Sequence, residues 1–299
     1  MEYKTEVQQP DLLPEPSVAY IAANEMQRSI EPVYKTSDTA LYNNDCLDIM
    51  NLLPDNYIDM IFADPPYNLS NDGITCHAGK MVSVNKGKWD KSNGFENDVE
   101  FHEKWISECR RILKPEGTIW ISGTNHSIYQ CGFLLQKLKF HILNDISWFK
   151  PNAAPNLACT TFAHSHETLL WAKKDKKAKH IFNYEKMKNG IFNEDKMKVP
   201  DKQMRSVWSI PTPSPDEKIF GKHPTQKPLA LLKRIVVAST NEGCLIVDPF
   251  NGGGTTGVAA KIVGNREYIG IDIEKEYIDL TINRLNQINT QNTLFSNEQ

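Results

Sequence analysis

Short apolar runs recur along the chain and alternate with segments of helical periodicity. The runs have the length and composition of buried β-strands. They cover residues 39–42, 57–63, 118–121, 142–149, 167–172, 244–248 and 267–272. In the segments between them, apolar residues return every three to four positions, as on one face of an amphipathic helix. These segments cover residues 46–53, 99–113, 126–138, 229–240, 256–263 and 277–288, and a further short helix is predicted within 17–30.

Alternating strands and helices predict an α/β protein with a doubly wound, mostly parallel, seven-stranded sheet. The chain has 299 residues, of which 40% are hydrophobic and 24% charged, as in an ordinary globular protein with one large core. No apolar run is long enough to span a membrane, and no signal peptide is evident. The six cysteines are scattered without a Cys-x-x-Cys pair, which argues against a zinc site and indicates a reducing cytoplasm.

The stretch Asp64-Pro65-Pro66-Tyr67 directly follows the predicted strand 57–63. Two prolines end the strand and stiffen the chain just beyond its carboxyl end, which is where ligands bind in open α/β sheets. The Asp64 carboxylate and the Pro65 carbonyl can each accept a hydrogen bond from an amino group, and the Tyr67 ring can stack on a flat heterocycle. The alternative is a proline-rich turn with a buried tyrosine.

Two polar segments interrupt the regular pattern. Residues 68–96 are rich in Asn, Gly, Ser and Lys, and a loop of this length indicates either a lid or DNA-contacting loop or a disordered insertion. Residues 173–205 contain eleven Lys or Arg against five Asp or Glu, with aromatic residues between them. This composition favours contact with nucleic-acid phosphates over a solvated lysine-rich surface, although the net charge of the whole chain is −3.

Near the C-terminus, the glycine-rich loop 249–256 lies between a predicted strand and a predicted helix, and the next strand ends at Asp272. Strand, glycine-rich turn, helix, strand and acid is the layout of a nucleotide-binding βαβ unit. The loop lacks the dinucleotide pattern G-x-G-x-x-G, and the absence of Gly-Lys-Ser/Thr argues against an ATPase.

Together, Asp64–Tyr67 and Asp248-Pro-Phe-x-Gly-x-Gly-Thr-Thr resemble the two motifs of the β-class DNA amino-methyltransferases. The resemblance covers about residues 38–288. In related RNA and protein methyltransferases the cofactor loop precedes the Pro-Pro-Tyr motif, whereas here it follows. The resemblance implies a circularly permuted S-adenosylmethionine-dependent methyltransferase fold, in which the strand at 39–42 lies beside the strand at 267–272. Gly253, where the family more often has Ser, is a small departure.

The resemblance also assigns roles to residues of this chain. It implies catalytic roles for Asp64, Pro65, Pro66 and Tyr67, with Tyr67 stacking on an extruded base. It implies that S-adenosylmethionine is bound by Asp45, Cys46, Asp64, His223, Thr225, Lys227, Asp248, Phe250, Asn251, Gly252, Gly254, Thr255, Thr256 and Asp272. It implies DNA contacts at Asn68, Lys86, Lys88, Lys150, Asn152, Lys173, Lys174, Lys176 and Lys177. No metal site is expected.

The same resemblance divides the chain into an N-terminal arm and two halves of one catalytic domain. The predicted parts are the arm at 1–37, a catalytic half at 38–172, a target-recognition insertion at 173–220, an S-adenosylmethionine-binding half at 221–288 and a tail at 289–299. The expected partners are double-stranded DNA, single-stranded DNA for some of these enzymes, and a second copy in a homodimer.

The expected reaction is direct methyl transfer to an exocyclic amine, with no covalent enzyme intermediate. An Asp at the first motif position points, by family habit, to adenine N6, whereas cytosine-N4 enzymes more often have Ser. Segments 70–74, 82–87 and 155–157 are similar to the second methyltransferases of Dpn-type restriction–modification systems, which implies GATC as the target. The alternatives are another short adenine-containing site, cytosine N4, RNA or protein as substrate, and a DNA- or nucleotide-binding module without activity.

Overall fold

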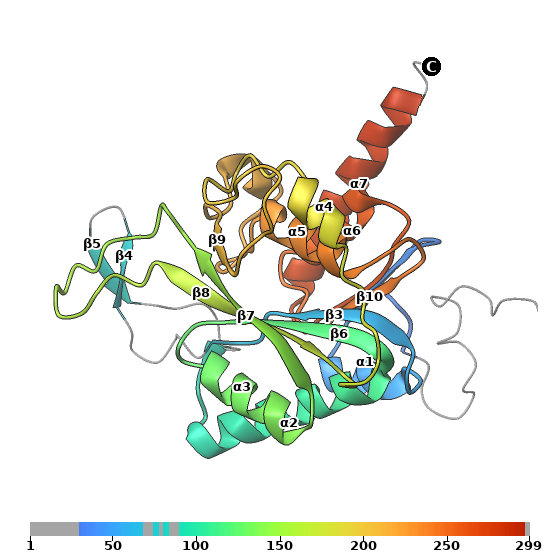
Figure 1. The fold of residues 1–299 in the computed structure, drawn as a ribbon, viewed down its shortest axis with the longest axis horizontal. Helices are drawn as coiled ribbons and strands as arrows, with labels where there is room; N and C mark the ends of the chain where they lie inside the picture. The colour runs from blue at the N-terminus through green and yellow to red at the C-terminus, as the bar shows by residue number, and fades with distance from the viewer. Residues whose placement is uncertain (1–29, 68–73, 78–79, 84–89, 297–299) are drawn as a thin grey trace, which may run out of the picture.

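A nine-stranded sheet forms the centre of the computed structural model, which describes residues 30–67, 74–77, 80–83 and 90–296 (Figure 1). The strand order is β1–β2–β11–β10–β3–β6–β8–β7–β9. The prediction of seven strands was wrong by the two outermost ones, β1 (Tyr34–Lys35) and β9 (Val207–Ser209). Strands of two and three residues are too short to show a hydrophobic alternation in the sequence.

The seven predicted strands are all present, and most of their pairings are parallel. They are β2 (Thr39–Asn43), β3 (Ile58–Ala63), β6 (Leu113–Gly123), β7 (His141–Phe149), β8 (His166–Lys173), β10 (Leu245–Asp248) and β11 (Glu267–Asp272). From β2 to β6 every pairing is parallel, whereas β8 pairs antiparallel with both β6 and β7. The α/β class and the mostly parallel sheet are therefore confirmed.

The predicted circular permutation is also present, because β2 and β11 are adjacent parallel strands. Their register runs from Thr39 opposite Tyr268 to Asn43 opposite Asp272. β2, from near the start of the described chain, is thus paired with β11, the last strand in sequence. This pairing brings the two halves of the chain into a single sheet.

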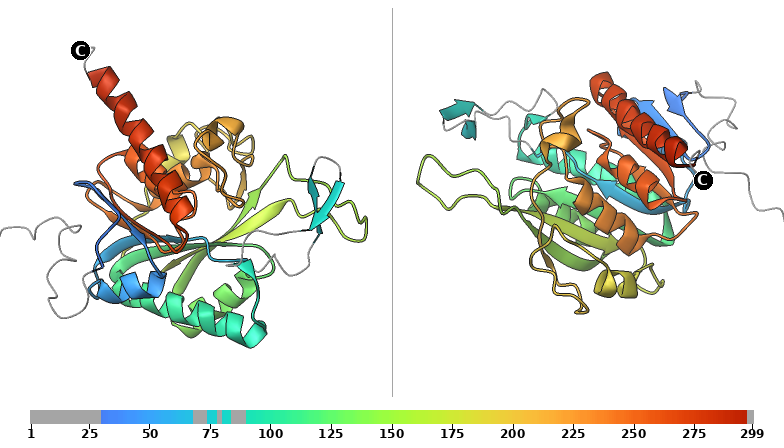
Figure 2. Two further views of the ribbon diagram at one scale, coloured as in Figure 1. Left: turned by 180° about the vertical axis from the view of Figure 1, so that it is seen from behind. Right: turned by 90° about the horizontal axis from the view of Figure 1, so that it is seen from above.

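Helices cover both faces of the sheet (Figures 1 and 2). One face carries α1 (Cys46–Leu52), α2 (Phe95–Ile112) and α3 (Ile128–Lys137). The other carries α5 (Leu229–Ser239), α6 (Thr255–Val263) and α7 (Lys275–Ser296). A separate buried hydrophobic cluster lies under each layer, as a doubly wound fold requires.

Several local predictions differ from the structure. The helix α7 continues to Ser296, through most of the predicted tail. Two strands, β4 (Ile74–His77) and β5 (Lys80–Ser83), form an antiparallel hairpin within the predicted loop 68–96. The predicted insertion contains one short helix, α4 (Tyr184–Asn189), and the 3-10 turn η3 (Pro215–Lys218). The helix predicted within 17–30 lies almost wholly outside the described residues. Of the helices that the structure describes, none is both long and apolar enough to cross a membrane.

Candidate active site

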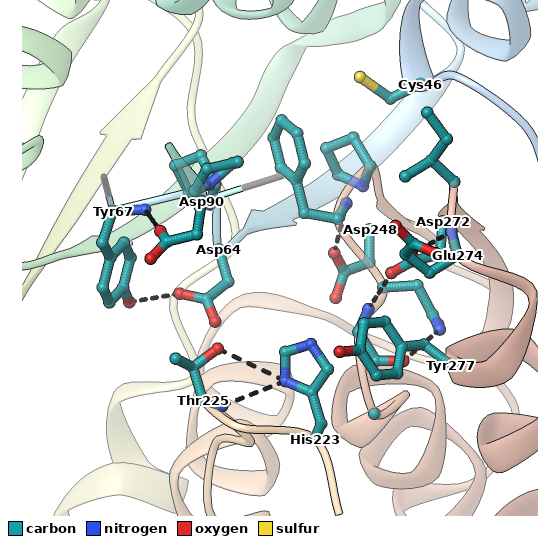
Figure 3. Close-up of a pocket in the computed structure, with 18 of the residues that line it drawn as sticks. Cys46, Asp64, Tyr67, Asp90, His223, Thr225, Asp248, Asp272, Glu274 and Tyr277 are labelled. Atoms are coloured by element: carbon teal, nitrogen blue, oxygen red, sulfur yellow. Dashed lines mark hydrogen bonds between the residues drawn. The ribbon is translucent and has the colours of Figure 1, made fainter. Parts of the chain in front are cut away.

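A cavity of about 310 Å³ lies at the carboxyl ends of the parallel strands. Asp64 follows β3, Asp248 ends β10 and Asp272 ends β11, while Asp45 follows β2 by two residues. This is the edge at which open α/β sheets bind ligands, and the volume suits a small-molecule or cofactor site. Figure 3 shows Asp64 with Tyr67 on one side of the site and Asp248 with Asp272 on the other.

The structure brings together nearly all the residues predicted to be catalytic or to bind the cofactor. The cavity is lined by Asp45, Cys46, Asp64, Pro65, Pro66, Tyr67, His223, Thr225, Lys227, Asp248, Phe250, Asn251, Gly252, Thr255, Thr256 and Asp272. Of the predicted set, Gly254 alone does not line it. The stretch after β3 and the glycine-rich loop, far apart in the sequence, therefore form one site.

Gly254 is required by the close packing of the loop against α7. Its φ of +68° is in the left-handed region, and a Cβ there would lie 2.3 Å from the Oγ1 atom of Thr281 on α7. Gly252 has a φ of +49°, and its Cβ would lie 3.3 Å from the ring of His223. The loop thus needs glycine at both positions for its own geometry.

The carboxylates of Asp248 and Asp272, here called the acidic wall, are held by neutral groups. Asp248 accepts hydrogen bonds from the backbone N–H of Phe250 at 3.0 Å and the hydroxyl of Thr256 at 2.6 Å. Asp272 accepts from the backbone N–H groups of Gly252 at 2.6 Å and Glu274 at 2.9 Å. Neither forms an ion pair with another described residue.

Burial without a cationic partner changes the titration of the acidic wall. It raises the pKa of Asp248 to about 7 and the pKa of Asp272 to about 6, because desolvation penalises the charged form. The hydrogen bonds from Thr256 and the backbone oppose this effect only in part. The acidic wall is therefore suited to a cationic or hydroxyl-bearing ligand, which would favour the ionised carboxylates.

Other side chains of the glycine-rich loop support its shape. Asn251 donates to the Thr281 hydroxyl at 2.9 Å and accepts from the Tyr268 hydroxyl at 2.8 Å. Thr255 accepts from the buried guanidinium of Arg284 at 3.0 Å. These polar groups are engaged with the core, so at Asn251 and Thr255 the backbone is better placed than the side chain to contact a ligand.

Aromatic rings and a helix start complete this side of the cavity. Phe250 packs edge-on against Trp105 of α2, with ring centroids 5.3 Å apart. His223 packs against Tyr277 of α7 at 4.3 Å. The Asp45 carboxylate accepts from the backbone N–H of Leu47 at 2.8 Å and so caps α1. An apolar slot beside a polar rim is the usual composition of a cofactor site.

On the opposite side, five buried or nearly buried side chains form what we call the charge cluster: Asp64, Tyr67, Lys150, Glu167 and Lys227. The ammonium group of Lys227 lies 2.5 Å from the Asp64 carboxylate and 3.6 Å from that of Glu167. Lys150 pairs with Glu167, and its ammonium group lies 4.7 Å from the ring centroid of Trp148. Two acids thus face two ammonium groups.

The Tyr67 hydroxyl links the two acids of the charge cluster. It donates to Asp64 and lies 3.1 Å from a Glu167 oxygen and 2.8 Å from the Ser122 hydroxyl. The backbone N–H of Tyr67 donates to Asp90 at 2.9 Å. These contacts fix the Tyr67 ring as a rigid wall of the cavity (Figure 3).

The charges in this cluster are unequally compensated. Burial raises the pKa of Asp64, and Glu167 raises it further, while Lys227 partly opposes both. Burial alone would lower the pKa of Lys227, but the charges of Asp64 and Glu167 outweigh it and raise this pKa. The pKa of Glu167 is lowered because Lys227 and Lys150 together outweigh its desolvation. Asp64 is therefore the acid whose charge depends most on the rest of the cluster.

Glu167, Ser122 and Asp90 were not among the predicted site residues. Glu167 begins the apolar run 167–172, and an acid at the end of a buried strand is the signal that could have indicated its role. Ser122 lies within β6, and Asp90 within the polar segment 68–96, where no local pattern marks them. Lys227 was predicted to bind the cofactor, but the structure places its ammonium group against Asp64.

Comparisons with known proteins agree with this geometry. A family model described as DNA methylase matches residues 58–283, which include both motifs. The chain belongs to this DNA methylase family. It is 49% identical to the type II methyltransferase M2.DpnII of Streptococcus pneumoniae over 88% of this chain and 95% of that protein. It is 46% identical to M2.MboI of Moraxella bovis over 87% of this chain and 92% of that protein.

Solved structures support the fold of the DNA methylase. A complex of M1.HpyAVI with SAM superimposes with a TM-score of 0.60 at 28% identity, over 83% of this chain and 99% of that one. The cytosine-N4-specific PvuII DNA methyltransferase has a TM-score of 0.64 at 18% identity, over 85% and 88% of the two chains. The predicted family and fold are confirmed, and the fold by itself does not separate adenine from cytosine.

The residues predicted to contact DNA occupy different places in this DNA methylase. Asn68, Lys86 and Lys88 lie outside the described residues. The Lys150 ammonium group is paired with Glu167. Asn152 uses both ends of its amide on Thr212, at 2.9 and 3.1 Å. Both side chains therefore hold protein structure together.

Lys173 and Lys174, predicted to contact DNA, donate hydrogen bonds to the protein's own backbone. Lys173 is buried and donates to the Ala178 carbonyl at 2.8 Å. Lys174 donates to the carbonyls of Arg111 and Leu113 at 3.2 and 2.6 Å. Lys173 pairs with Thr118, at the edge of the sheet opposite Asp64, because β8 runs antiparallel to β6.

Lys176 and Lys177 follow β8 at this same far edge, and both are exposed. The predicted contacts at the four lysines are thus separated from the cavity by the length of the sheet. In the described part of the DNA methylase, no three His, Cys, Asp or Glu residues gather as metal ligands would.

Proposed function

We propose that this DNA methylase transfers a methyl group from S-adenosylmethionine to adenine N6, within GATC, as part of a restriction–modification system. The observation that carries the proposal is the position of Asp64. Its carboxylate stands at the end of β3 in the same cavity as the acidic wall, so one side can hold a cationic cofactor and the other an amino group.

The cavity fits S-adenosylmethionine by charge and shape. When bound, S-adenosylmethionine supplies a methyl carbon that is bonded to a positively charged sulfur. Asp248 and Asp272, which have no basic partner among the described residues, can compensate a positive charge and accept hydrogen bonds from ribose hydroxyls. Phe250 offers a ring face between the start of α1 and the glycine-rich loop, where a flat heterocycle can pack.

The residues on the Asp64 side orient a poor nucleophile. The lone pair of an aromatic amine is delocalised into the ring, so hydrogen bonds from its N–H groups to Asp64 and the Pro65 carbonyl favour a tetrahedral nitrogen. Lys227 and Tyr67 hold the carboxylate in one orientation. Preorganised acceptors of this kind lower the barrier because they need not reorganise during reaction. With S-adenosylmethionine bound, the methyl–sulfur bond would break as the N–C bond forms, leaving a neutral thioether, and the Asp64 carboxylate would accept the proton that the amine loses.

Adenine in GATC is the finer part of the proposal. It rests on Asp64 at the first motif position, on the similarity of segments 70–74, 82–87 and 155–157 to GATC enzymes, and on relatives that are 46–49% identical over most of the chain. A cytosine-N4 enzyme shares the fold. The choice of target base and of recognition sequence must therefore be determined by individual side chains and not by the fold.

A methyl-transfer assay on synthetic DNA tests this function. Tritiated S-adenosylmethionine is offered with a GATC duplex, with a duplex in which the site is changed to GTAC, with each GATC single strand and with the matching RNA. We expect label on GATC DNA alone, recovered as N6-methyladenine after digestion. Label on the GTAC duplex would reject GATC as the recognition sequence, and recovery of N4-methylcytosine would reject adenine as the target base. Label on RNA alone would reject DNA as the substrate.

The proposal extends to two properties of the whole enzyme. We propose action on single strands as well as duplexes, which the same assay measures, and a cytoplasmic homodimer. Light scattering at working concentration is expected to give twice the mass of the 34.0 kDa chain. A mass equal to one chain would reject the dimer.

A further inference from the structure

Residues 150–165, which connect β7 and β8, begin and end beside the charge cluster. The backbone N–H of Lys150 donates to the Ser165 carbonyl at 2.7 Å and closes the base of this segment, here called the β7–β8 loop. The Lys150 side chain pairs with Glu167, which also contacts the Tyr67 hydroxyl. The loop is thus anchored to the residues that surround Asp64.

The β7–β8 loop extends away from the sheet, on the side of the molecule where the β4–β5 hairpin lies (Figures 1 and 2). His166 pairs with Phe149 at the end of the strands nearest to Asp64, so the loop leaves the sheet at the same edge as the cavity. A long DNA duplex cannot enter the cavity, and a target base must therefore be extruded at this edge.

Hydrogen bonds within the β7–β8 loop give it a defined shape. The Asn156 amide donates to the carbonyl and the hydroxyl of Thr161, at 2.9 and 2.8 Å, and accepts from the Ala158 N–H at 3.0 Å. Asn152 ties the lower part of the loop to Thr212. A loop held in this way can present a side chain in a fixed position.

The side chain presented is Phe162, which is 96% exposed, the largest value among the exposed large hydrophobic residues that the structure describes. It directly follows Thr161, the residue held by Asn156. Leu157, on the other side of this hydrogen-bonded turn, is also exposed. An aromatic side chain held in this way beside an active site is available to contact a bound substrate.

The composition of the β7–β8 loop indicates which partner this is. Residues 150–166 contain no Asp or Glu, whereas they contain one Lys and two His. A loop without acidic residues can approach phosphates without repulsion. Apolar side chains, Phe among them, insert between DNA bases as wedges. Extrusion of a base leaves a flat gap in the stack, into which an aromatic ring fits.

We propose that Phe162 inserts into the DNA base stack at the place vacated by the target adenine and so stabilises the extruded state. This inference rests on the proposed methylation of a DNA base. Phe162 is a positioning residue, since it contacts the neighbouring bases and not the reacting amine. A single strand has no paired stack to restore, so Phe162 matters for duplex substrates only.

The test compares Phe162→Ala with the wild type on a GATC duplex and on the single strand of the same sequence. We expect the duplex kcat/KM to fall about tenfold or more, since nothing then fills the gap that the extruded base leaves in the stack. The single-strand kcat/KM stays within about twofold, because the cavity is unchanged. Phe162→Trp, which keeps an aromatic wedge, restores the duplex value.

A matched control is Phe133→Ala, which removes another exposed phenylalanine, 64% exposed on α3. We expect Phe133→Ala to leave kcat/KM unchanged for both the duplex and the single strand. A duplex with 2-aminopurine in place of the target adenine gives a readout that does not need methyl transfer. Its fluorescence rises when the base leaves the stack, and we expect this rise with wild type and a much smaller one with Phe162→Ala.

These outcomes separate the wedge from the proposed function. Equal duplex activity in Phe162→Ala and wild type, equal losses on duplex and single strand, or no fluorescence rise with wild type would overturn the wedge. If the fluorescence rise depended on Phe162 but the methyl-transfer assay on the GATC duplex gave no N6-methyladenine, the wedge would be supported and the proposed function rejected. A lower mass of Phe162→Ala in light scattering would assign the residue to a protein contact and also overturn the wedge.

Discussion

The two sides of the cavity stabilise carboxylates in different ways. On the acidic wall, Asp248 and Asp272 are held by backbone N–H groups and one threonine, with no ion pair among the described residues. In the charge cluster, Asp64 is held by the ammonium group of Lys227. The wall can therefore take up a positive charge from a ligand, whereas Asp64 already has its counter-ion and needs only a neutral hydrogen-bond donor. The acidic wall is therefore suited to binding the cofactor, and Asp64 is suited to orienting the amine that accepts the methyl group.

The largest effect should follow from changing Asp64 itself. Asp64→Asn keeps the size of the side chain but replaces one acceptor oxygen with a donor that faces the Lys227 ammonium or the incoming amine. We expect turnover to fall about 10²–10³-fold, as when one preorganised electrostatic contact to a transition state is lost. Single-turnover methyl transfer measures this. Asp55→Asn, in a surface ion pair with Arg111, is the control and should be close to wild type.

A smaller effect is expected when Asp64 loses its counter-ion. In Lys227→Met, burial and Glu167 raise the pKa of Asp64, and only the hydrogen bond from Tyr67 still opposes them. Since the carboxylate is the acceptor, activity disappears as the pH falls through this pKa, and the loss should now begin at higher pH. We expect turnover to fall about tenfold at the acidic end of the pH range in which the wild type is active, and to fall less at the alkaline end. Lys227→Arg should lie between, and Lys261→Met, which breaks the half-buried pair with Asp38, should keep the wild-type profile.

If Lys227→Met lowered turnover by the same factor at every pH, the ammonium group would act through packing and not through the charge of Asp64. Thermal unfolding of each variant provides the check on folding, because removing one partner of a buried ion pair is costly.

The acidic wall should make cofactor affinity depend on pH to a modest degree. Asp248 and Asp272 have raised pKa values of about 7 and about 6, and a cationic ligand favours their ionised forms. Affinity should therefore be full above pH 8 and fall about tenfold by pH 5.5, as protons compete with the ligand. Calorimetry across this range measures it. Affinity that is constant or rises toward low pH would contradict the assignment of these acids.

The smallest effect is expected far from the cavity. Replacing Lys176 and Lys177 with Gln should leave the salt dependence of DNA binding unchanged, because both follow β8 at the opposite edge of the sheet. If either lysine contacts a phosphate, the slope of log affinity against log salt falls by about one per contact. A fall of that size would return the insertion to the DNA interface.

Local patterns predicted one side of the cavity far better than the other. The loop 249–256 and Asp272 belong to one continuous strand–loop–helix–strand unit, so their spacing predicted a ligand site there, and the family resemblance added Asp248. The charge cluster joins residues that are distant in sequence. Asp64 and Lys227 are 163 positions apart, and Tyr67 and Glu167 are 100 apart. No periodicity within a window of the sequence reports such contacts.

In the insertion, residues 173–220, a local sequence pattern predicted a contact that depends on the topology of the sheet. A high density of lysines predicted phosphate contacts, but the direction of β8 decides where its last residues lie. Since β8 is antiparallel to β6, Lys173 lies beside Thr118 and far from the strand ends that carry Asp64. The composition of the segment indicated its charge, but only the topology shows that Lys173 lies at the edge of the sheet opposite Asp64.

The most direct test measures S-adenosylmethionine affinity and methyl transfer in Asp64→Asn and Asp272→Asn side by side. We expect Asp64→Asn to bind the cofactor within about twofold of wild type and to lose nearly all turnover. We expect Asp272→Asn to bind about tenfold or more weakly, as for a lost hydrogen bond to a charged group, and to recover turnover within a few-fold at saturating cofactor. If Asp64→Asn lost cofactor affinity as strongly as Asp272→Asn, or if Asp64→Asn kept wild-type turnover, the division of the cavity would be wrong.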